Sequence, residues 1–188
     1  MTKILLPRSA ALLATALFFT GTAMHGQSPP VTSVDVAGWQ PADRATPAIR
    51  VATQRDAASG MWTYTYTVTN GHSAAQRLGS LLLRTDAPIA DVRAPAGWIA
   101  VLAGTPSARP AVIVQAELAP PGTRSNALAP GGRLSFTLTS PAAPGTIVYA
   151  ARGEVPAVSR EDLPLSAQKR IPGPESDALR GSTMGPVP

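Results

Sequence analysis

Alternating apolar and polar residues dominate the middle of the chain. In Met61–Thr69, aromatic and aliphatic residues occupy every second position from Trp62, and threonines occupy the positions between them. Successive side chains of a β-strand point to opposite faces, so this two-residue period predicts a strand with one apolar and one hydroxyl face. Both kinds of residue also favour strands by local propensity. We therefore expect a half-buried strand with Tyr64 and Tyr66 on its buried face.

Other short segments show a strand pattern and are separated by turn signals. They are Val31–Val36, Ala48–Gln54, Leu78–Leu83, Ile89–Val92, Trp98–Leu102, Ala111–Ala116, Leu134–Thr139 and Thr146–Arg152. No helical segment lies between these strands, which argues against a parallel α/β fold. Seven to nine short strands at close spacing are typical of an antiparallel two-sheet sandwich. We expect an all-β fold of this kind.

The turn signals between the strands are specific. Asp56–Gly60 is a turn sequence ahead of the best strand, and Asn70-Gly71 tolerates the positive φ that would end it. The next apolar run begins only at Leu78, so the connection is long enough to cross to a second sheet. In Ala94–Gly97, Pro95 takes the second position of a predicted turn.

The first 23 residues have the pattern of an export signal. Lys3 and Arg8 flank a first apolar patch, Ile4–Leu6. The unbroken apolar run Ala10–Phe19 follows. Ten residues rise only about 15 Å as a helix, half of a ~30 Å hydrocarbon core, so this run is too short to span a membrane. Small residues place cleavage after Ala23, with His25-Gly26 as a nearby alternative. We expect a periplasmic or secreted protein with no transmembrane segment in its mature chain.

Between this signal and the C-terminus the pattern predicts one domain, over residues 27–158. From about Pro156 onward prolines recur and large apolar residues become few. Such a segment buries too little apolar surface to offset the entropy lost on ordering. We expect a flexible, disordered tail over residues 159–188, with a short helix at Arg160–Arg170 as a weak alternative.

Composition agrees with a globular exported protein and excludes several kinds of site. Of 188 residues, 44% are hydrophobic and 14% are charged, which is enough apolar material for a core. The absence of cysteine excludes disulfides, thiol nucleophiles, thiolate metal sites and lipid-modified cysteine. The formal charge is +5, and two basic residues lie in the signal. Since the basic residues from Arg50 to Arg152 are scattered singly, with no run of them, we expect no nucleic-acid partner.

Two segments together resemble a known pattern. Tyr64–Asn70 and Leu128–Leu138 are similar to the Y-x-Y-x-V-x-N and L-x-P-G-x-x-x-x-F-x-L signatures of bacterial extracellular immunoglobulin-like repeat modules. Between them, Pro95–Trp98 is similar to a turn of uncharacterised secreted domains. The resemblance spans residues 61–152, and the chain carries one copy where those modules form tandem arrays. It implies an immunoglobulin-like sandwich and no catalytic residues.

Candidates for catalysis are sparse. His72, next to Ser73 in a turn, is the histidine available to a triad in the mature chain beyond the cleavage region. Adjacent side chains of a loop seldom converge on one substrate, so we interpret His72 as a solvated turn residue. Glu117 and Glu154 lie beside predicted strands and would be the pair for a glycoside hydrolase. We expect no catalytic residue, and keep this pair as the remote alternative.

The sequence also predicts no metal and no cofactor. Asp86 and Asp91 lie five residues apart around Pro88 and could belong to a calcium loop. However, a dedicated calcium loop has a denser spacing of oxygen ligands than this segment offers.

Exposed aromatic residues are the remaining candidates for ligand binding. Trp39 and Trp98 stand beside prolines and glycines, so we expect them to be exposed, whereas Trp62 shares its parity with core residues. The leading hypothesis is a non-enzymatic interaction or structural module of the bacterial cell envelope. Its partner would be another envelope or extracellular protein, met through a sheet edge or a loop end. The alternative is a carbohydrate-binding module that contacts polysaccharide through Trp39 and Trp98.

Overall fold

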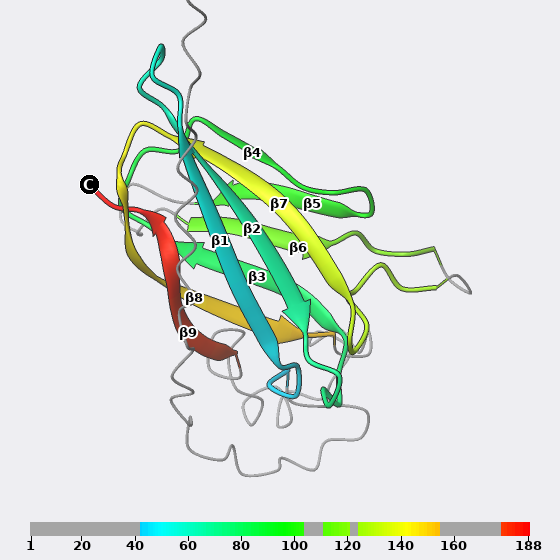
Figure 1. Cartoon of the computed structure of the whole chain (residues 1–188). Coiled ribbons are helices and arrows are strands. Elements are labelled where there is room, and N and C mark those ends of the chain that lie inside the picture. Colours follow the sequence, from blue (N-terminus) through cyan, green and yellow to red (C-terminus); the bar gives the residue numbers. More distant parts are fainter. Residues whose placement is uncertain (1–41, 104–110, 121–123, 155–177) are drawn as a thin grey trace, which may run out of the picture.

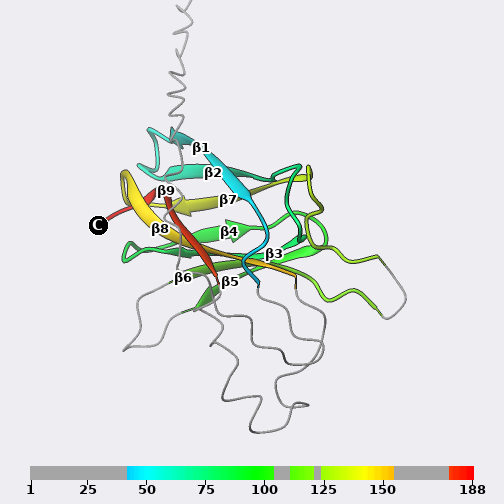
Figure 2. The ribbon, with the colours of Figure 1, turned by 90° about the horizontal axis from the view of Figure 1, so that it is seen from below.

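The protein is an all-β sandwich of two antiparallel sheets, as its sequence pattern predicts (Figure 1). The computed structural model describes residues 42–103, 111–120, 124–154 and 178–188. Within them, sheet A has the order β1-β2-β7-β4 and sheet B has the order β5-β6-β3-β8-β9. Figure 2 shows sheet A above sheet B.

The strands of sheet A are β1 (Pro47–Arg55), β2 (Trp62–Asn70), β4 (Asp91–Arg93) and β7 (Arg133–Ser140). Those of sheet B are β3 (Leu78–Arg84), β5 (Trp98–Ala103), β6 (Ala111–Ala116), β8 (Pro144–Gly153) and β9 (Leu179–Pro186). Most bounds match the predicted segments to within two residues. One element differs from prediction, since β9 is an additional strand.

The centre of the core is formed by β2, whose side chains alternate as predicted. Tyr64, Tyr66 and Val68 are at most 1% exposed, whereas the threonines between them are partly exposed. Tyr66 stacks on Phe136 of the neighbouring β7, with ring centroids 4.7 Å apart and an interplanar angle of 5°. Sheet B contributes buried residues from four strands to the same core: Leu81, Leu83, Trp98, Val112, Val114, Ile147, Tyr149 and Ala151.

Asn70, the last residue of β2, connects both sheets at one end of the sandwich. Its side chain is completely buried and makes three hydrogen bonds to backbone groups. The Thr46 N–H donates to its Oδ1 at 3.0 Å, and its Nδ2 donates to the carbonyls of Gln76 at 2.8 Å and Leu128 at 3.1 Å. Buried backbone groups without a partner are costly, so this one amide stabilises three chain segments.

Two details of the predicted turns are wrong. Positive φ values occur among the described residues only at Gly60, Gly97 and Gly131, so Asn70-Gly71 does not use one. The side chain of Asn70, and not its backbone freedom, explains its place in the sequence. The turn before β5 is closed by a hydrogen bond from the Trp98 N–H to the Pro95 carbonyl at 3.1 Å, which puts Pro95 first and not second.

The predicted disordered tail over residues 159–188 is wrong for residues 178–188. There, β9 pairs with β8 along its whole length, and the Thr85 hydroxyl donates to the Pro186 carbonyl at 2.6 Å. Glycine made this strand hard to recognise. A Cβ at Gly181 would lie 2.6 Å from the Tyr149 hydroxyl, so the missing side chain makes room for a large one from β8.

Several expectations fall on residues that the structure does not describe. These are the export signal over 1–23, the strand Val31–Val36, the exposure of Trp39 and the helix Arg160–Arg170. They stay predictions.

Replacing Asn70 by alanine tests its role. Asn70→Ala removes three hydrogen bonds, each of which contributes about 1 kcal/mol, while the Leu128 carbonyl keeps its bond from the Leu78 N–H at 2.8 Å. We expect the free energy of unfolding, measured by urea denaturation, to fall by about 3 kcal/mol or more. Asn126→Ala is the matched control, because the Asn126 amide makes one exposed bond to the Glu117 carbonyl at 3.2 Å. A similar small loss in both variants would contradict the role of Asn70.

Candidate functional site

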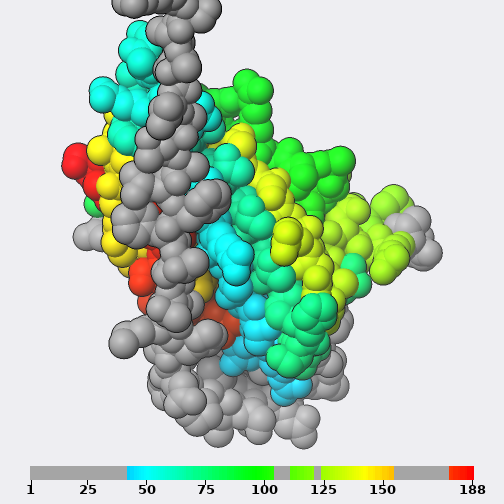
Figure 3. Space-filling model, in the orientation of Figure 1, coloured from blue at the N-terminus to red at the C-terminus, as the bar shows by residue number. Residues whose placement is uncertain are grey.

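The outer faces of the two sheets differ in chemistry. Sheet A presents hydroxyl pairs between β2 and β7, such as Thr65 opposite Thr137 and Thr67 opposite Ser135. Figure 3 shows this face, on which β1, β2 and β7 lie side by side. Sheet B instead aligns apolar residues across four strands, because Val101 pairs with Ile113, Ile113 with Leu82, and Leu82 with Ala150.

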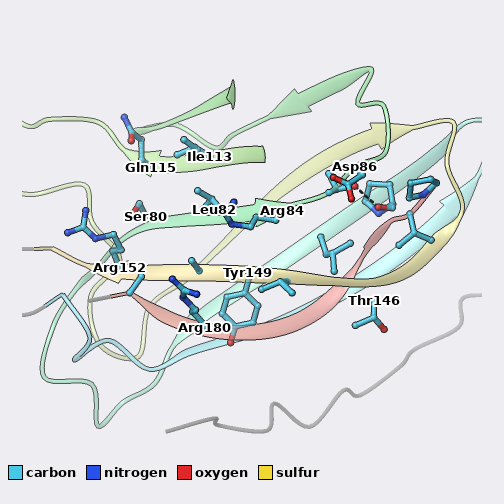
Figure 4. Close-up of a pocket in the computed structure, with 18 residues that line it drawn as sticks. Ser80, Leu82, Arg84, Asp86, Ile113, Gln115, Thr146, Tyr149, Arg152 and Arg180 are labelled. Atoms are coloured by element: carbon cyan, nitrogen blue, oxygen red, sulfur yellow. Dashed lines mark hydrogen bonds between the residues drawn. The ribbon is translucent and has the colours of Figure 1, made fainter. Parts of the chain in front are cut away.

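A pocket of about 530 Å³ lies on the outer face of sheet B (Figure 4). We call it the sheet B pocket. Its apolar lining includes Leu82, Ile113 and Val148, and its polar lining includes Ser80, Gln115, Asp86, Arg84, Arg152 and Arg180. Arg152 and Arg180 lie at one end and Asp86 at the other. The combination of apolar side chains and guanidinium groups is suited to contacting an amphipathic surface.

Strand alternation explains how this surface arises. In β3, Leu81 and Leu83 are at most 2% exposed and fill the core, so Leu82 between them must face outward. The sequence is apolar without interruption at Leu81–Leu83 and at Ala111–Val114. An unbroken apolar run in an antiparallel sheet also signals an apolar outer face, which the sequence interpretation missed.

The apolar surface continues to the edge of sheet B at β5. Ile99, Val101 and Leu102 are 39%, 45% and 55% exposed, respectively. Leu102 lies on the same side of β5 as the buried Trp98, so it faces the inside of the sandwich. It is nevertheless exposed, because β4, the strand of sheet A near β5, is only three residues long. Within the described part of the chain, β5 has β6 on one side and no strand on the other.

Trp98 is not the exposed ligand contact that its neighbours suggested. It is 8% exposed and belongs to the core cluster. The turn at Pro95–Trp98, with positive φ at Gly97, directs the first side chain of β5 inward. Trp62, which was expected in the core, is partly buried, with the Arg55 guanidinium 5.9 Å from its ring centroid.

Glu117 and Glu154 lie at the same end of sheet B, just after β6 and β8, and have different surroundings. The Glu154 carboxylate accepts a hydrogen bond from the Ser125 hydroxyl and lies 3.5 Å from Nε of Arg77. Glu117 is exposed, and its backbone N–H donates to the Gly97 carbonyl at 2.9 Å. The structure therefore gives Glu154 a role in fixing the loop before β7, where Arg77 Nη2 also donates to the Ala127 carbonyl at 2.6 Å.

The remaining polar candidates are separate from one another. His72 is exposed in a turn, as predicted, and a Cβ at Gly131 would touch its ring. Asp91 accepts a hydrogen bond from Arg93 at 2.7 Å, while Asp86 lines the sheet B pocket. Among the described residues, no group of three or more histidine, aspartate or glutamate side chains is placed to hold a metal ion.

The strongly shifted titratable groups are core tyrosines. Burial raises the pKa of Tyr64 to about 12, because an ionised phenolate would lose its hydration. Burial raises the pKa of Tyr66 further, and the nearby Tyr64 adds to this shift. Burial also raises the pKa of Tyr149, beside the sheet B pocket. The Tyr64 hydroxyl donates to the Ala142 carbonyl at 2.7 Å, whereas the Tyr66 hydroxyl has no partner among the described residues.

No protein-family model and no curated protein matches the chain. The described residues form no helix of the length and apolar character needed to cross a membrane.

Because only one of the two tyrosine hydroxyls is hydrogen-bonded within the described residues, we expect their phenylalanine variants to differ in stability. Tyr64→Phe removes a hydrogen bond and is expected to lower the free energy of unfolding by about 1 kcal/mol, whereas Tyr66→Phe is expected to leave it unchanged or slightly higher. Urea denaturation at about pH 8 measures both effects. A larger loss in Tyr66→Phe than in Tyr64→Phe would contradict the assignment.

The same tyrosines predict how stability depends on pH. Their folded pKa values are raised, so their stabilisation is complete below the unfolded value of about 10. This stabilisation is lost as the pH rises from about 10 through the pKa values of the folded state. The folded pKa of Tyr64 is about 12. We expect urea midpoints to fall steeply above about pH 10 in the parent chain and less steeply in Tyr66→Phe.

Proposed function

We propose that the protein is an exported, non-enzymatic β-sandwich that acts as an interaction module at the bacterial cell envelope. Its partner would meet the outer face and the open edge of sheet B. The proposal of export rests on the basic, apolar and small residues of the first 23 positions. The immunoglobulin-like character of the sandwich rests on the resemblance of Tyr64–Asn70 and Leu128–Leu138 to extracellular modules.

The observation that carries the proposal is the position of the exposed apolar side chains. In the described part of the chain, the exposed large hydrophobic residues are Ile99, Val101, Leu102, Leu118 and Val148. Four of these five lie on strands of sheet B and none lies on sheet A. Contiguous exposed apolar surface with polar residues at its border is characteristic of interaction sites. The hydroxyl-rich face of sheet A offers no comparable surface.

The proposal of a non-enzymatic role rests on what the catalytic candidates do. The Glu154 carboxylate forms an ion pair with Arg77 and accepts a hydrogen bond from the Ser125 hydroxyl. These contacts suit a structural role, which is to hold the loop before β7 at the end of the sandwich. The His72 ring lies against Gly131 in an exposed turn. We therefore assign the chemistry of this chain to binding.

The carbohydrate-binding alternative has lost one of its two candidate residues. A sugar-stacking tryptophan must present its ring face to solvent, and the side chain of Trp98 is in the core. Trp39 lies outside the described residues and stays a candidate from sequence only.

Site-specific photo-crosslinking tests the proposed function. A photoreactive amino acid at Val148, in the middle of the outer face of sheet B, is expected to give a discrete crosslinked product in cells that export the chain. The matched position is Thr65, in the middle of the outer face of sheet A. We expect at least tenfold less product from Thr65. Products should appear in the periplasmic or culture fraction.

The outcomes separate the hypotheses. A discrete protein product from Val148 supports the proposal, and its mass identifies the type of partner. Equal products from both positions, or none from Val148, would contradict it. A product that polysaccharide-degrading enzymes shorten would favour the carbohydrate alternative.

A further inference from the structure

We propose that β5 pairs antiparallel with β5 of a second copy of this chain, with a two-fold axis at Ala100. The two copies would then share one continuous sheet formed from both B sheets. This inference rests on the proposed role of sheet B as an interaction surface, and it names the occupant of its edge.

The backbone of β5 directs alternate groups toward this edge. The Glu117 N–H donates to the Gly97 carbonyl at 2.9 Å, which fixes the phase of the β5–β6 ladder. In an antiparallel pair, bonded residues alternate, so Ile99 and Val101 bond to β6. Trp98, Ala100 and Leu102 therefore direct their N–H and carbonyl groups away from β6. In agreement with this alternation, the Trp98 N–H does not bond to β6 and donates to the Pro95 carbonyl at 3.1 Å.

A two-fold axis at Ala100 uses these groups in one register. The Ala100 N–H would donate to the carbonyl of the partner's Ala100, and the Leu102 N–H to the carbonyl of the partner's Trp98. Each bond occurs twice by symmetry, which gives four hydrogen bonds. The Trp98 N–H keeps its hydrogen bond to the Pro95 carbonyl of the same copy, so no N–H has to serve two acceptors.

The same register covers the exposed side chains of β5. Ile99 lies opposite the partner's Val101 on the outer face, and Leu102 lies opposite the partner's Trp98 on the inner face. Ile99, Val101 and Leu102, which are exposed in one copy, would therefore each gain an apolar neighbour. This coincidence of backbone and side-chain matching is our reason for naming a second copy.

Charge also favours self-pairing at β5 over the other edges. Like charges that face each other across a strand pair are destabilising. β5 has no charged residue, whereas β1 carries Arg50 and Arg55 and β9 carries Arg180. The remaining edge strand, β4, is only three residues long. Exposed edges usually carry a charge or a proline that blocks pairing, and β5 has neither.

The first test is the mass of the exported chain in solution, measured by light scattering over a range of concentrations. We expect twice the protomer mass at high concentration and dissociation on dilution, because one edge is a small interface. Ala100→Pro removes an N–H that the monomer does not use, and proline is tolerated at such edge positions. We expect at least a tenfold weaker dimer. Thr53→Pro, on β1 with its N–H also directed away from its neighbour, should leave the dimer unchanged.

A charge exchange keeps the test valid if the proline variant fails to fold. Chains with Ile99→Lys and Val101→Lys, or with Ile99→Glu and Val101→Glu, should each be monomeric. Mixed together, they should associate at least about tenfold more tightly than either does alone, because every outer contact then joins opposite charges. Equal association in all three samples would overturn the register.

The outcomes also separate this inference from the proposed function. A chain that is monomeric at every concentration, while Val148 crosslinks to a different protein, overturns the dimer and leaves the interaction module intact. A dimer that responds to the β5 variants while Val148 gives no product supports the dimer and overturns the broader proposal.

Discussion

The need of every backbone N–H and carbonyl for a partner shapes this protein more than any other constraint. At one end of the sandwich, the buried Asn70 amide meets that need for Thr46, Gln76 and Leu128 at once. Along the sheets, strand pairing meets it for all inner strands. The outer strands differ, since β1 and β9 approach each other on one side while β5 ends sheet B on the other. We place the proposed contact at β5, one of the edge strands whose outward N–H and carbonyl groups have no neighbouring strand among the described residues.

Packing and function are linked through the parity of the strands. Because the inner face of sheet B must match the aromatic face of β2, residues such as Leu81 and Leu83 point inward, and the residues between them face solvent. Several of those outward residues are themselves apolar, namely Leu82 in β3, Ile99 and Val101 in β5, and Ile113 in β6. The hydroxyl-rich outer face of sheet A shows that the same fold does not require this. Apolar residues on the outside of sheet B therefore point to a contact with another molecule.

The sequence pattern predicted the strands well because a period of two is a local property, visible in Tyr64–Val68 without knowledge of any partner strand. It missed β9, since Gly181 and Gly185 matter only through Tyr149 and Ile147 of β8. Trp98 was misjudged because neighbouring proline and glycine indicate a turn and not the direction of the side chain. The sheet order, and with it the open edge at β5, depends on pairings between distant residues that composition and periodicity do not contain.

Amide hydrogen exchange, resolved to single residues, tests the open edge of β5 most directly. The N–H of Val101 bonds within the sandwich and should be protected at every concentration, whereas those of Ala100 and Leu102 face the edge. Our account predicts that Ala100 and Leu102 exchange rapidly in dilute solution and become protected as the concentration rises. Slow exchange at both residues in dilute solution, or rapid exchange at every concentration, would contradict it.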